Sequence, residues 1–127
     1  MNLNQVTLPS RDLNIAIPFY QKLGLQLIVH SGPDYARFEC PDGTSTFSLH
    51  RVDTLRPDPG LAIYFEVDNL DEQVAKLIGQ GIVFEHLPKD QSWLWREAHL
   101  LDPDKNRLIL YYAGKNRKDP PWRLKDA

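Results

Sequence analysis

The chain has 127 residues, of which 42% are hydrophobic and 25% charged, and its formal net charge is −2 at pH 7. This length fits one domain with a sizeable core, and the composition is that of a globular protein. The small negative charge disfavours a nucleic-acid partner, which would need a basic face. The single Cys40 excludes an internal disulfide framework and fits a reducing compartment. The residues after Met1 lack the basic and apolar regions typical of a secretory signal, and no apolar run approaches about 20 residues, so we expect a cytoplasmic protein without a membrane partner.

The first half of the chain predicts a strand, a helix and three further strands. Leu3 to Leu8 alternates in polarity, as in a half-buried strand. Asp12 is a good N-cap, and apolar residues then recur at helical spacing until Gly24 supplies a stop. Pro18 conflicts with this helix because it lacks an N–H, so it should kink the helix or place its start nearer to itself. The later strands are expected at 25–30, 35–40 and 44–51, and the apolar helix positions are Leu13, Ala16, Ile17, Tyr20 and Leu23.

The second half repeats this order, which indicates an internal duplication. Asp68 or Asn69 should cap the second helix and Gly81 should end it. The segment Leu87-Pro88-Lys89-Asp90 is expected to be a loop. The strands are expected at 61–67, 82–86, 95–101 and 107–112, and the buried helix stripe is Leu70, Val74, Leu77 and Ile78.

Together these elements predict an α+β fold. Two βαβββ modules should form a curved mixed sheet with the helices on its convex side. Trp122, in the tail, should pack against the body or a second subunit, because so large an apolar group is rarely left in water. We expect a single domain over 1–127, with modules at 3–52 and 61–113, a linker at 53–60 that holds Pro57 and Pro59, and a tail at 114–127.

In each module one face of the strands is aliphatic and suits the helix, whereas the other face is polar or aromatic. A solvated face explains polarity, but it explains less well the clustering of His, Tyr, Trp and paired charges. We interpret this face as a concave ligand-binding surface, with a mostly solvated face as the alternative. It carries Gln5, Thr7, Arg37, Glu39, Thr46, Ser48, His50, Tyr64, Glu66, Trp95, Glu97, His99, Arg107 and Tyr111.

Two ionisable groups on this face are candidate catalytic residues. Histidine is the residue type that changes charge near neutral pH, so His50 is a candidate base or ligand contact, with a hydrogen-bonded edge histidine as the alternative. Glu97 could act as a base or bind a cation, and structural pairing with an arginine is the alternative. The stretch 93–97 holds two tryptophans that could stack on a planar compound or anchor a dimer contact. The predicted ligand-binding residues are Gln5, His50, Tyr64, Glu66, Trp95, Glu97 and Tyr111.

Several spaced segments make the chain resemble a known group. They are Asp12-Leu13, Pro18-Phe19-Tyr20, Leu23-Gly24-Leu25 and the late Asp102-Pro103-Asp104 before a strand. With the two βαβββ units, they resemble the vicinal oxygen chelate (VOC) superfamily over about residues 3–113. That superfamily contains glyoxalase I, bleomycin-resistance proteins, extradiol dioxygenases and fosfomycin-resistance transferases. The resemblance implies a homodimer, but it does not fix a reaction because this fold hosts unrelated chemistries.

The enzymes of the VOC superfamily hold a divalent metal with His, Gln or Glu ligands from the first, fourth, fifth and eighth strands. The matching positions here are Gln5, Ser48, Ala62 and Ile109. Only Gln5 is an acceptable ligand, whereas a catalytic ion needs about three protein ligands. We therefore predict no metal at the usual site and no cofactor. The alternative is a displaced divalent-metal site built from His50, Glu66, Glu97 or His99, groups that also pair as ordinary salt bridges.

The leading interpretation is a glyoxalase/bleomycin-resistance-like protein that binds a flat or amphipathic small molecule and has a degenerate metal site. The first alternative is a VOC-type enzyme, either a lactoylglutathione lyase-like lyase or isomerase or a dioxygenase. It would use a displaced metal or an acid–base pair of His50 and a glutamate. The second alternative is a protein-interaction module anchored by Trp93, Trp95 and Trp122.

Overall fold

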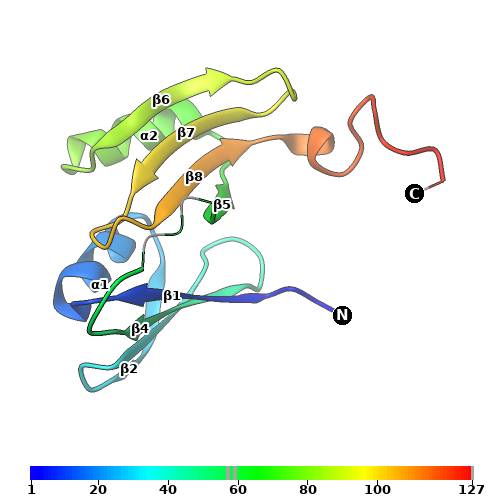
Figure 1. The fold of residues 1–127 in the computed structure, drawn as a ribbon. Coiled ribbons are helices and arrows are strands. Elements are labelled where there is room, and N and C mark those ends of the chain that lie inside the picture. The colour runs from blue at the N-terminus through cyan, green and yellow to red at the C-terminus, as the bar shows by residue number, and fades with distance from the viewer. Residues whose placement is uncertain (57, 59, 127) are drawn as a thin grey trace. The chain divides into compact units, whose positions relative to one another are not determined.

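The computed structural model in Figure 1 describes residues 1–56, 58 and 60–126. Its internal contacts divide the chain into two units, each of which is described by itself. Unit 1 is Met1–Pro59 with Asp102–Asn106, and unit 2 is Gly60–Leu101 with Arg107–Ala127. Two positions of the expected linker, Pro57 and Pro59, lie outside the described residues. In the described ranges, no helix has the length and apolar character needed to span a bilayer.

Unit 1 holds a four-stranded mixed sheet in the order β1-β4-β3-β2. Its first strand pairs in parallel with the fourth, and the other neighbours are antiparallel. The helix α1 contacts β2 and β3. The elements are β1 (Gln5–Ser10), α1 (Leu13–Lys22), β2 (Gln26–Ser31), β3 (Tyr35–Glu39) and β4 (Thr46–Arg51).

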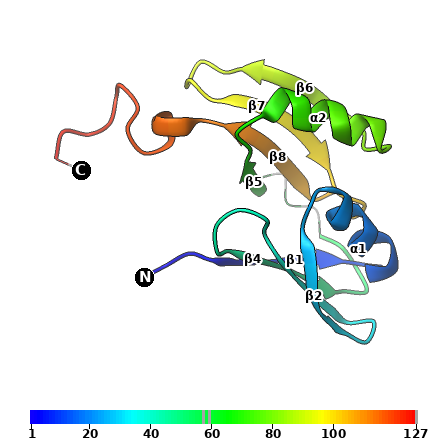
Figure 2. The same cartoon turned by 180° about the vertical axis from the view of Figure 1, so that it is seen from behind.

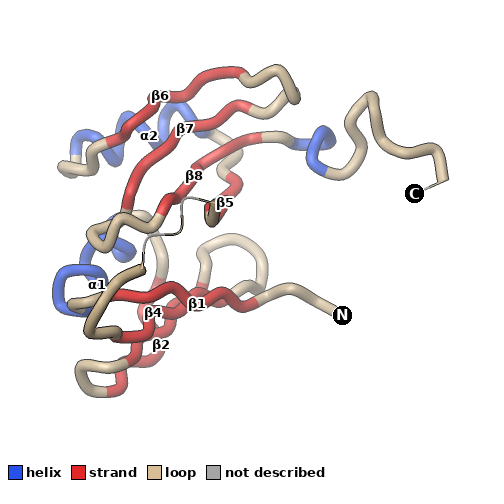
Figure 3. Tube along the Cα trace, viewed as in Figure 1, coloured by secondary structure: helices blue, strands red, loops and turns tan. Residues whose placement is uncertain are grey.

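Unit 2 repeats the arrangement with the order β5-β8-β7-β6. Its parallel pair is β5 with β8, and the helix α2 contacts β6 and β8. Figure 2 shows α2 along one face of this sheet, and Figure 3 separates strands from loops. The elements are β5 (Ala62–Glu66), α2 (Leu70–Gly79), β6 (Phe84–Asp90), β7 (Arg96–Leu101), β8 (Arg107–Tyr112) and the 3₁₀ helix η1 (Gly114–Arg117).

The predicted α+β class and the two βαβββ modules are confirmed, with the strands paired in one sheet per module. The prediction of a loop at 87–90 is wrong, because β6 continues to Asp90. The first strand also begins and ends two residues later than predicted, so that it includes Pro9. Both strands are at the edge of their sheet, where a proline does not have to donate a ladder hydrogen bond.

The first helix begins where its cap predicts. The Asp12 carboxylate accepts a hydrogen bond from the Asn14 N–H at 2.9 Å, and the helix runs through Pro18 from Leu13. The alternative of a later start is therefore wrong. Gly24 ends this segment with a φ of +101°, a conformation in which a side chain would be strained. In α2, Ile78 is 46% exposed, so its predicted burial is wrong, whereas Leu70, Val74 and Leu77 are buried.

Each helix buries its apolar stripe against the apolar face of its own sheet. In unit 1, the ring of Tyr20 lies 4.6 Å from that of Phe47, and Phe38 packs beside both. The Tyr20 hydroxyl donates to Asp102 at 2.6 Å. Because the helices occupy one face of each sheet, the opposite face is left for polar and aromatic side chains.

Candidate functional site

The face of the unit 2 sheet opposite α2 carries a cluster of rings around an aliphatic centre. We call this cluster of Tyr64, Trp95, Ile109 and Tyr111 the aromatic face. The register sets Tyr64 beside Ile109, and Glu97 and His99 beside Tyr111 and Ile109 on the neighbouring strand. Side chains alternate between the faces of a strand, so residues two apart on β5, β7 and β8 share this surface.

The rings of the aromatic face hold one another in fixed orientations. Trp95 stacks on Tyr111 with centroids 4.7 Å apart, and Tyr64 meets both edge-on at 5.8 and 5.4 Å. Tyr111 is 6% exposed, whereas Tyr64 is 46% exposed and Trp95 is half-buried. The face thus offers partly open ring surface on a buried base, a geometry that suits stacking of a flat compound.

Beside these rings lies a buried carboxylate with both oxygens occupied. Glu97 is 2% exposed; one oxygen accepts from the Trp93 indole at 2.8 Å and the other bonds the His99 Nε2 at 2.9 Å. We call Trp93, Glu97 and His99 the Glu97 cluster. A carboxylate removed from water needs such partners. His86 of β6 meets the His99 ring edge-on at 5.4 Å.

The loop between β6 and β7 delivers Trp93 to this carboxylate. Leu94 has a φ of +67°, which a branched side chain rarely adopts, and it is 47% exposed. Strain of this kind persists only where the surrounding contacts hold it. Here the backbone bond from the Leu94 N–H to Gln91 and the indole bond of Trp93 hold the loop.

Glu66 closes the other end of the aromatic face, but its carboxylate is already engaged. It accepts from the Ala113 and Gly114 N–H groups at 2.9 and 3.0 Å and lies 3.6 Å from Arg117. The Trp95 indole donates to the carbonyl of Asn116 at 3.1 Å. These contacts bind η1 to the aromatic face. Further along the tail, Trp122 is 57% exposed in the single chain, so the chain does not bury it, and its packing against a second subunit stays a prediction.

Electrostatics on this surface keep its phenols neutral. Burial, and secondarily Glu97, raises the pKa of Tyr64. Burial, and secondarily Glu66, raises the pKa of Tyr111. The phenols are therefore hydrogen-bond donors rather than anions.

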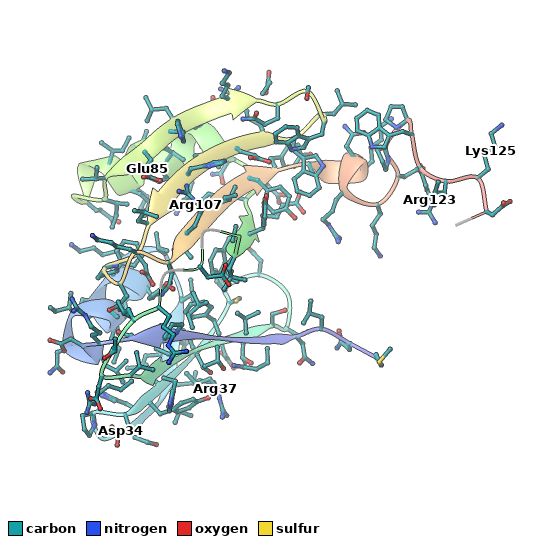
Figure 4. The ribbon with its side chains drawn as sticks, viewed as in Figure 1. Asp34, Arg37, Glu85, Arg107, Arg123 and Lys125 are labelled. Carbon is teal, nitrogen blue, oxygen red and sulfur yellow. The ribbon has the colours of Figure 1, made fainter. Side chains whose placement is uncertain are left out.

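On the same strand as Tyr111, Arg107 pairs with Glu85 at 2.9 Å, and Figure 4 shows these two side chains side by side.

The equivalent face of unit 1 carries a hydrogen-bonded network in place of rings. Its centre is Ser48, which is fully buried, accepts from the Gln5 amide at 2.8 Å and bonds the Tyr35 hydroxyl at 2.7 Å. Thr46 donates to the Gln5 carbonyl, and the Arg37 Nε donates to Tyr35 at 2.9 Å. The bond from Ser48, with help from Arg37, lowers the pKa of Tyr35. We call these five residues the polar network.

The predicted ligand-binding residues therefore divide between the units. Gln5 and His50 lie in unit 1, and the other five, Tyr64, Glu66, Trp95, Glu97 and Tyr111, lie together in unit 2. His50 is exposed near the end of β4, and its side chain makes no hydrogen bond or ion pair with the described residues. The prediction omitted Trp93 and His99 from the ligand-binding residues. Spacing indicated His99, since it shares the face of Glu97, but nothing in the sequence indicated that Trp93 reaches that carboxylate.

Comparison with known proteins places this architecture in a family. Residues 2–110 match the model of the Glyoxalase/Bleomycin resistance protein/Dioxygenase superfamily. The chain belongs to this superfamily, the VOC group expected from its sequence. Among curated proteins, it is 27% identical over 127 residues to YraH of Bacillus subtilis (strain 168), described as uncharacterized, covering 87% of this chain and 98% of YraH.

Solved structures of the superfamily share the fold at low identity. A bleomycin-binding protein complexed with bleomycin matches with a TM-score of 0.73 and 23% identity, covering 88% of this chain and 98% of its own. A lactoylglutathione lyase from Agrobacterium tumefaciens matches with a TM-score of 0.72 and 20% identity, covering 87% and 92%. A superfamily member from Nocardioides matches with a TM-score of 0.75 and 22% identity, covering 98% and 89%.

The residues at the metal positions implied by VOC resemblance do not fit a divalent ion. The Gln5 amide is occupied by Ser48 and Thr46, and the Ser48 hydroxyl is committed to Gln5 and Tyr35. In unit 2, Ala62 and Ile109 offer only carbon. Across the described residues, no group of three or more His, Cys, Asp or Glu is arranged to hold a metal. We derive no chemistry through a metal at these positions.

Proposed function

We propose that this VOC protein binds a flat, aromatic small molecule on the aromatic face of unit 2. The observation that carries the proposal is the stacked pair of Trp95 and Tyr111, with the open edge of Tyr64 against both. Protein sites for small molecules combine apolar and aromatic walls with a few placed polar groups. Here the polar groups are those of the Glu97 cluster.

The rigidity of the rings supports binding rather than simple exposure. Trp95 is held at both ends, by Tyr111 beneath its ring and by the Asn116 carbonyl at its indole nitrogen. A ring that is already fixed loses little conformational freedom when a ligand stacks on it, so more of the contact energy appears as affinity. The bleomycin-binding protein of the same fold was solved with bleomycin bound, which makes bleomycin a reasonable second probe.

Binding can be tested by calorimetry with 7-methoxycoumarin, a neutral planar probe, and with bleomycin. We expect saturable binding of one probe at least, and an increase in its thermal unfolding midpoint because the ligand stabilises the folded state. Tyr64→Leu should weaken binding of that probe about tenfold, since it removes an open ring edge that contributes stacking and apolar contact. Trp95→Ala should weaken it further.

A matched control is Trp122→Ala, which removes an indole that is 57% exposed in the tail. It should bind the probe like the wild-type protein. Far-ultraviolet circular dichroism of each variant separates loss of binding from loss of fold. Binding that persists in both Tyr64→Leu and Trp95→Ala would rule out the aromatic face as the binding surface.

Two other functions stay predictions. An acid–base enzyme is favoured by the buried Glu97–His99 contact of 2.9 Å, and it would require turnover of a bound compound that fails in Glu97→Gln. An interaction module would instead require that Trp93, Trp95 or Trp122 bind a partner protein while no small molecule binds. We also propose a homodimer, as the VOC resemblance implies, and a cytoplasmic location, as the sequence composition predicts. Light scattering on the purified chain measures the oligomeric state.

A further inference from the structure

The imidazole of His99 in unit 2 is oriented by the buried Glu97 carboxylate, and its second ring nitrogen is not hydrogen-bonded to the described residues. His99 bonds Glu97 through Nε2 at 2.9 Å, and its side chain is 23% exposed. No hydrogen bond to Nδ1 occurs within the part of the chain that the structure describes. An imidazole that donates Nε2–H to a carboxylate has a lone pair on Nδ1, so this nitrogen is an acceptor.

The carboxylate fixes this arrangement in two ways. Glu97 is 2% exposed and its other oxygen is held by the Trp93 indole at 2.8 Å, so it cannot swing away from His99. Its negative charge also stabilises the positive charge that forms if the imidazole takes a proton at Nδ1. A base that is oriented by a third, acidic group is the arrangement that activates imidazoles in many sites.

We infer that His99 accepts a proton from the ligand, so that the aromatic face selects planar compounds that carry an acidic hydroxyl, such as phenols and enols. The proton passes from the ligand oxygen to Nδ1, the oxygen keeps the electron pair of the broken O–H bond, and no co-reactant is needed. The bound state is a ligand oxyanion beside an imidazolium that Glu97 holds. This inference rests on the proposed function, because the ligand must first stack on the aromatic face.

The charged and titratable groups around His99 in unit 2 leave this role to it. His86 faces it from β6, and Arg107 lies diagonally across on β8 but is paired with Glu85 of β6. Tyr64 of β5 is a phenol whose pKa is raised, so it stays protonated and does not act as a base. Lys89 faces Glu97 from β6 in the strand register. Unlike these neighbours, His99 has both an Nδ1 atom that is free to accept a proton and a buried carboxylate, Glu97, that orients its ring.

His50, the base predicted from sequence, lacks such support. It lies exposed in unit 1, and its imidazole makes no hydrogen bond to the described residues that would fix its tautomer or ring orientation. This difference makes the two histidines a direct comparison for an experiment.

The test uses two planar probes that differ by one methyl group. 7-Hydroxycoumarin has an acidic hydroxyl and a distinct anion absorption band, whereas 7-methoxycoumarin has no proton to give. We expect wild-type protein to bind 7-hydroxycoumarin about tenfold more tightly near neutral pH, because an ion pair replaces a neutral contact. The bound hydroxycoumarin should ionise about one pH unit below the free probe, as read from its absorption spectrum.

Variants assign the effect to a side chain. His99→Ala should bind both coumarins equally and abolish the spectral shift, and His99→Gln is the second variant should the alanine protein fail to fold. Glu97→Gln should return the ionisation of bound hydroxycoumarin toward that of the free probe while His99 is still present, which marks Glu97 as a positioning residue. His30→Ala, an exposed histidine on β2, is the matched control and should change neither reading.

The outcomes separate this inference from the proposed function. If 7-methoxycoumarin binds but 7-hydroxycoumarin binds no more tightly, the role of His99 is refuted, whereas ligand binding on the aromatic face is still supported. If the gain persists in both His99 variants, or disappears in His50→Ala instead, His99 is not the acceptor. If neither coumarin binds, the inference fails together with its choice of planar phenols.

Discussion

The two sheets have the same topology, yet their free faces use opposite chemistry. Gln5 and Ala62 are the first residues of β1 and β5, and the parallel pairs align them with Thr46 of β4 and Arg107 of β8. Counting on from Thr46 and Arg107, Ser48 is equivalent to Ile109 and His50 to Tyr111. In unit 1 the central residue is a buried hydroxyl that needs the polar network around it. In unit 2 it is an isoleucine at 3% exposure, surrounded by rings. The duplicated backbone thus supports either a hydrogen-bonded face or a stacking face.

This comparison shows where ligand selectivity can arise. Hydrogen bonds in the polar network occupy the groups that a ligand would otherwise contact, because Gln5 and Tyr35 both bond Ser48. Ring packing leaves ring surface open and still fixes the side chains. Binding by stacking is therefore favoured in unit 2, and the polar network of unit 1 is the natural reference for it.

The largest expected difference between the units is at the equivalent positions Tyr111 and His50. Tyr111→Ala removes a ring that is 6% exposed and stacked under Trp95, so we expect the free energy of unfolding to fall by about 3–5 kcal/mol. His50→Ala removes an exposed side chain and should change it by less than about 0.5 kcal/mol. Urea denaturation followed by circular dichroism measures both. Similar losses in the two variants would mean that the faces are not energetically different.

Sequence periodicity predicted the fold because most of its signals are local. The Asp12 cap, the glycine stop at Gly24 and the strand expected at 107–112 each depend on near neighbours, and all three are borne out. Pro88 misled the prediction because whether a proline interrupts a strand depends on which strand lies at the edge of the sheet. That is a property of the whole sheet rather than of the segment.

The site was predictable only in its residue types. Alternation placed Tyr64, Trp95, Glu97 and Tyr111 on one face, and the structure brings these side chains into one cluster. It could not show that Glu97 would be buried and doubly bonded, because the bond from Trp93 depends on a strained loop. Nor could it show that His50 lies exposed, since exposure depends on long-range packing.

The two helices also differ at equivalent positions, where Tyr20 of α1 and Leu77 of α2 are both buried. In unit 1 the Tyr20 hydroxyl donates to Asp102 at 2.6 Å, whereas leucine has no polar atom. Tyr20→Phe should lower the free energy of unfolding by about 1–2 kcal/mol, because it removes one hydrogen bond to a charged group while keeping the ring. Tyr112→Phe, which deletes a hydroxyl from a 44% exposed ring, is the control and should be neutral in urea denaturation. Equal losses would show that the Tyr20 bond adds no stability.

The same contact predicts a pH dependence specific to unit 1. Burial raises the pKa of Asp102, and its hydrogen bonds, Tyr20 first, lower it only in part. Folded protein therefore holds the Asp102 proton more tightly than unfolded protein does. Its contribution to stability is greatest below the ordinary pKa of an aspartate and declines as pH rises through the raised pKa. The difference in the free energy of unfolding between wild type and Asp102→Asn, measured by urea denaturation from about pH 3 to 7, should become smaller as pH rises from the ordinary pKa of an aspartate through the raised pKa of Asp102. A difference that grows as pH rises would mean that folding lowers the pKa of Asp102 instead of raising it.

The smallest expected effect is on the surface of unit 2, where the sign is opposite. Asp71 of α2 bonds Arg96 of β7 through both of its oxygens, at 2.9 and 3.0 Å, and Arg96 also bonds Asp90. The bond from Arg96 lowers the pKa of Asp71, so its contribution is present above the unfolded pKa and is lost as pH falls through the lowered one. Because the pair is exposed, Asp71→Asn should lower Tm only slightly, and salt should reduce that loss further. A loss as large as that of Tyr20→Phe would mean that α2 depends on this ion pair rather than on its buried stripe. A loss that salt does not reduce would mean that it does not come from the ion pair.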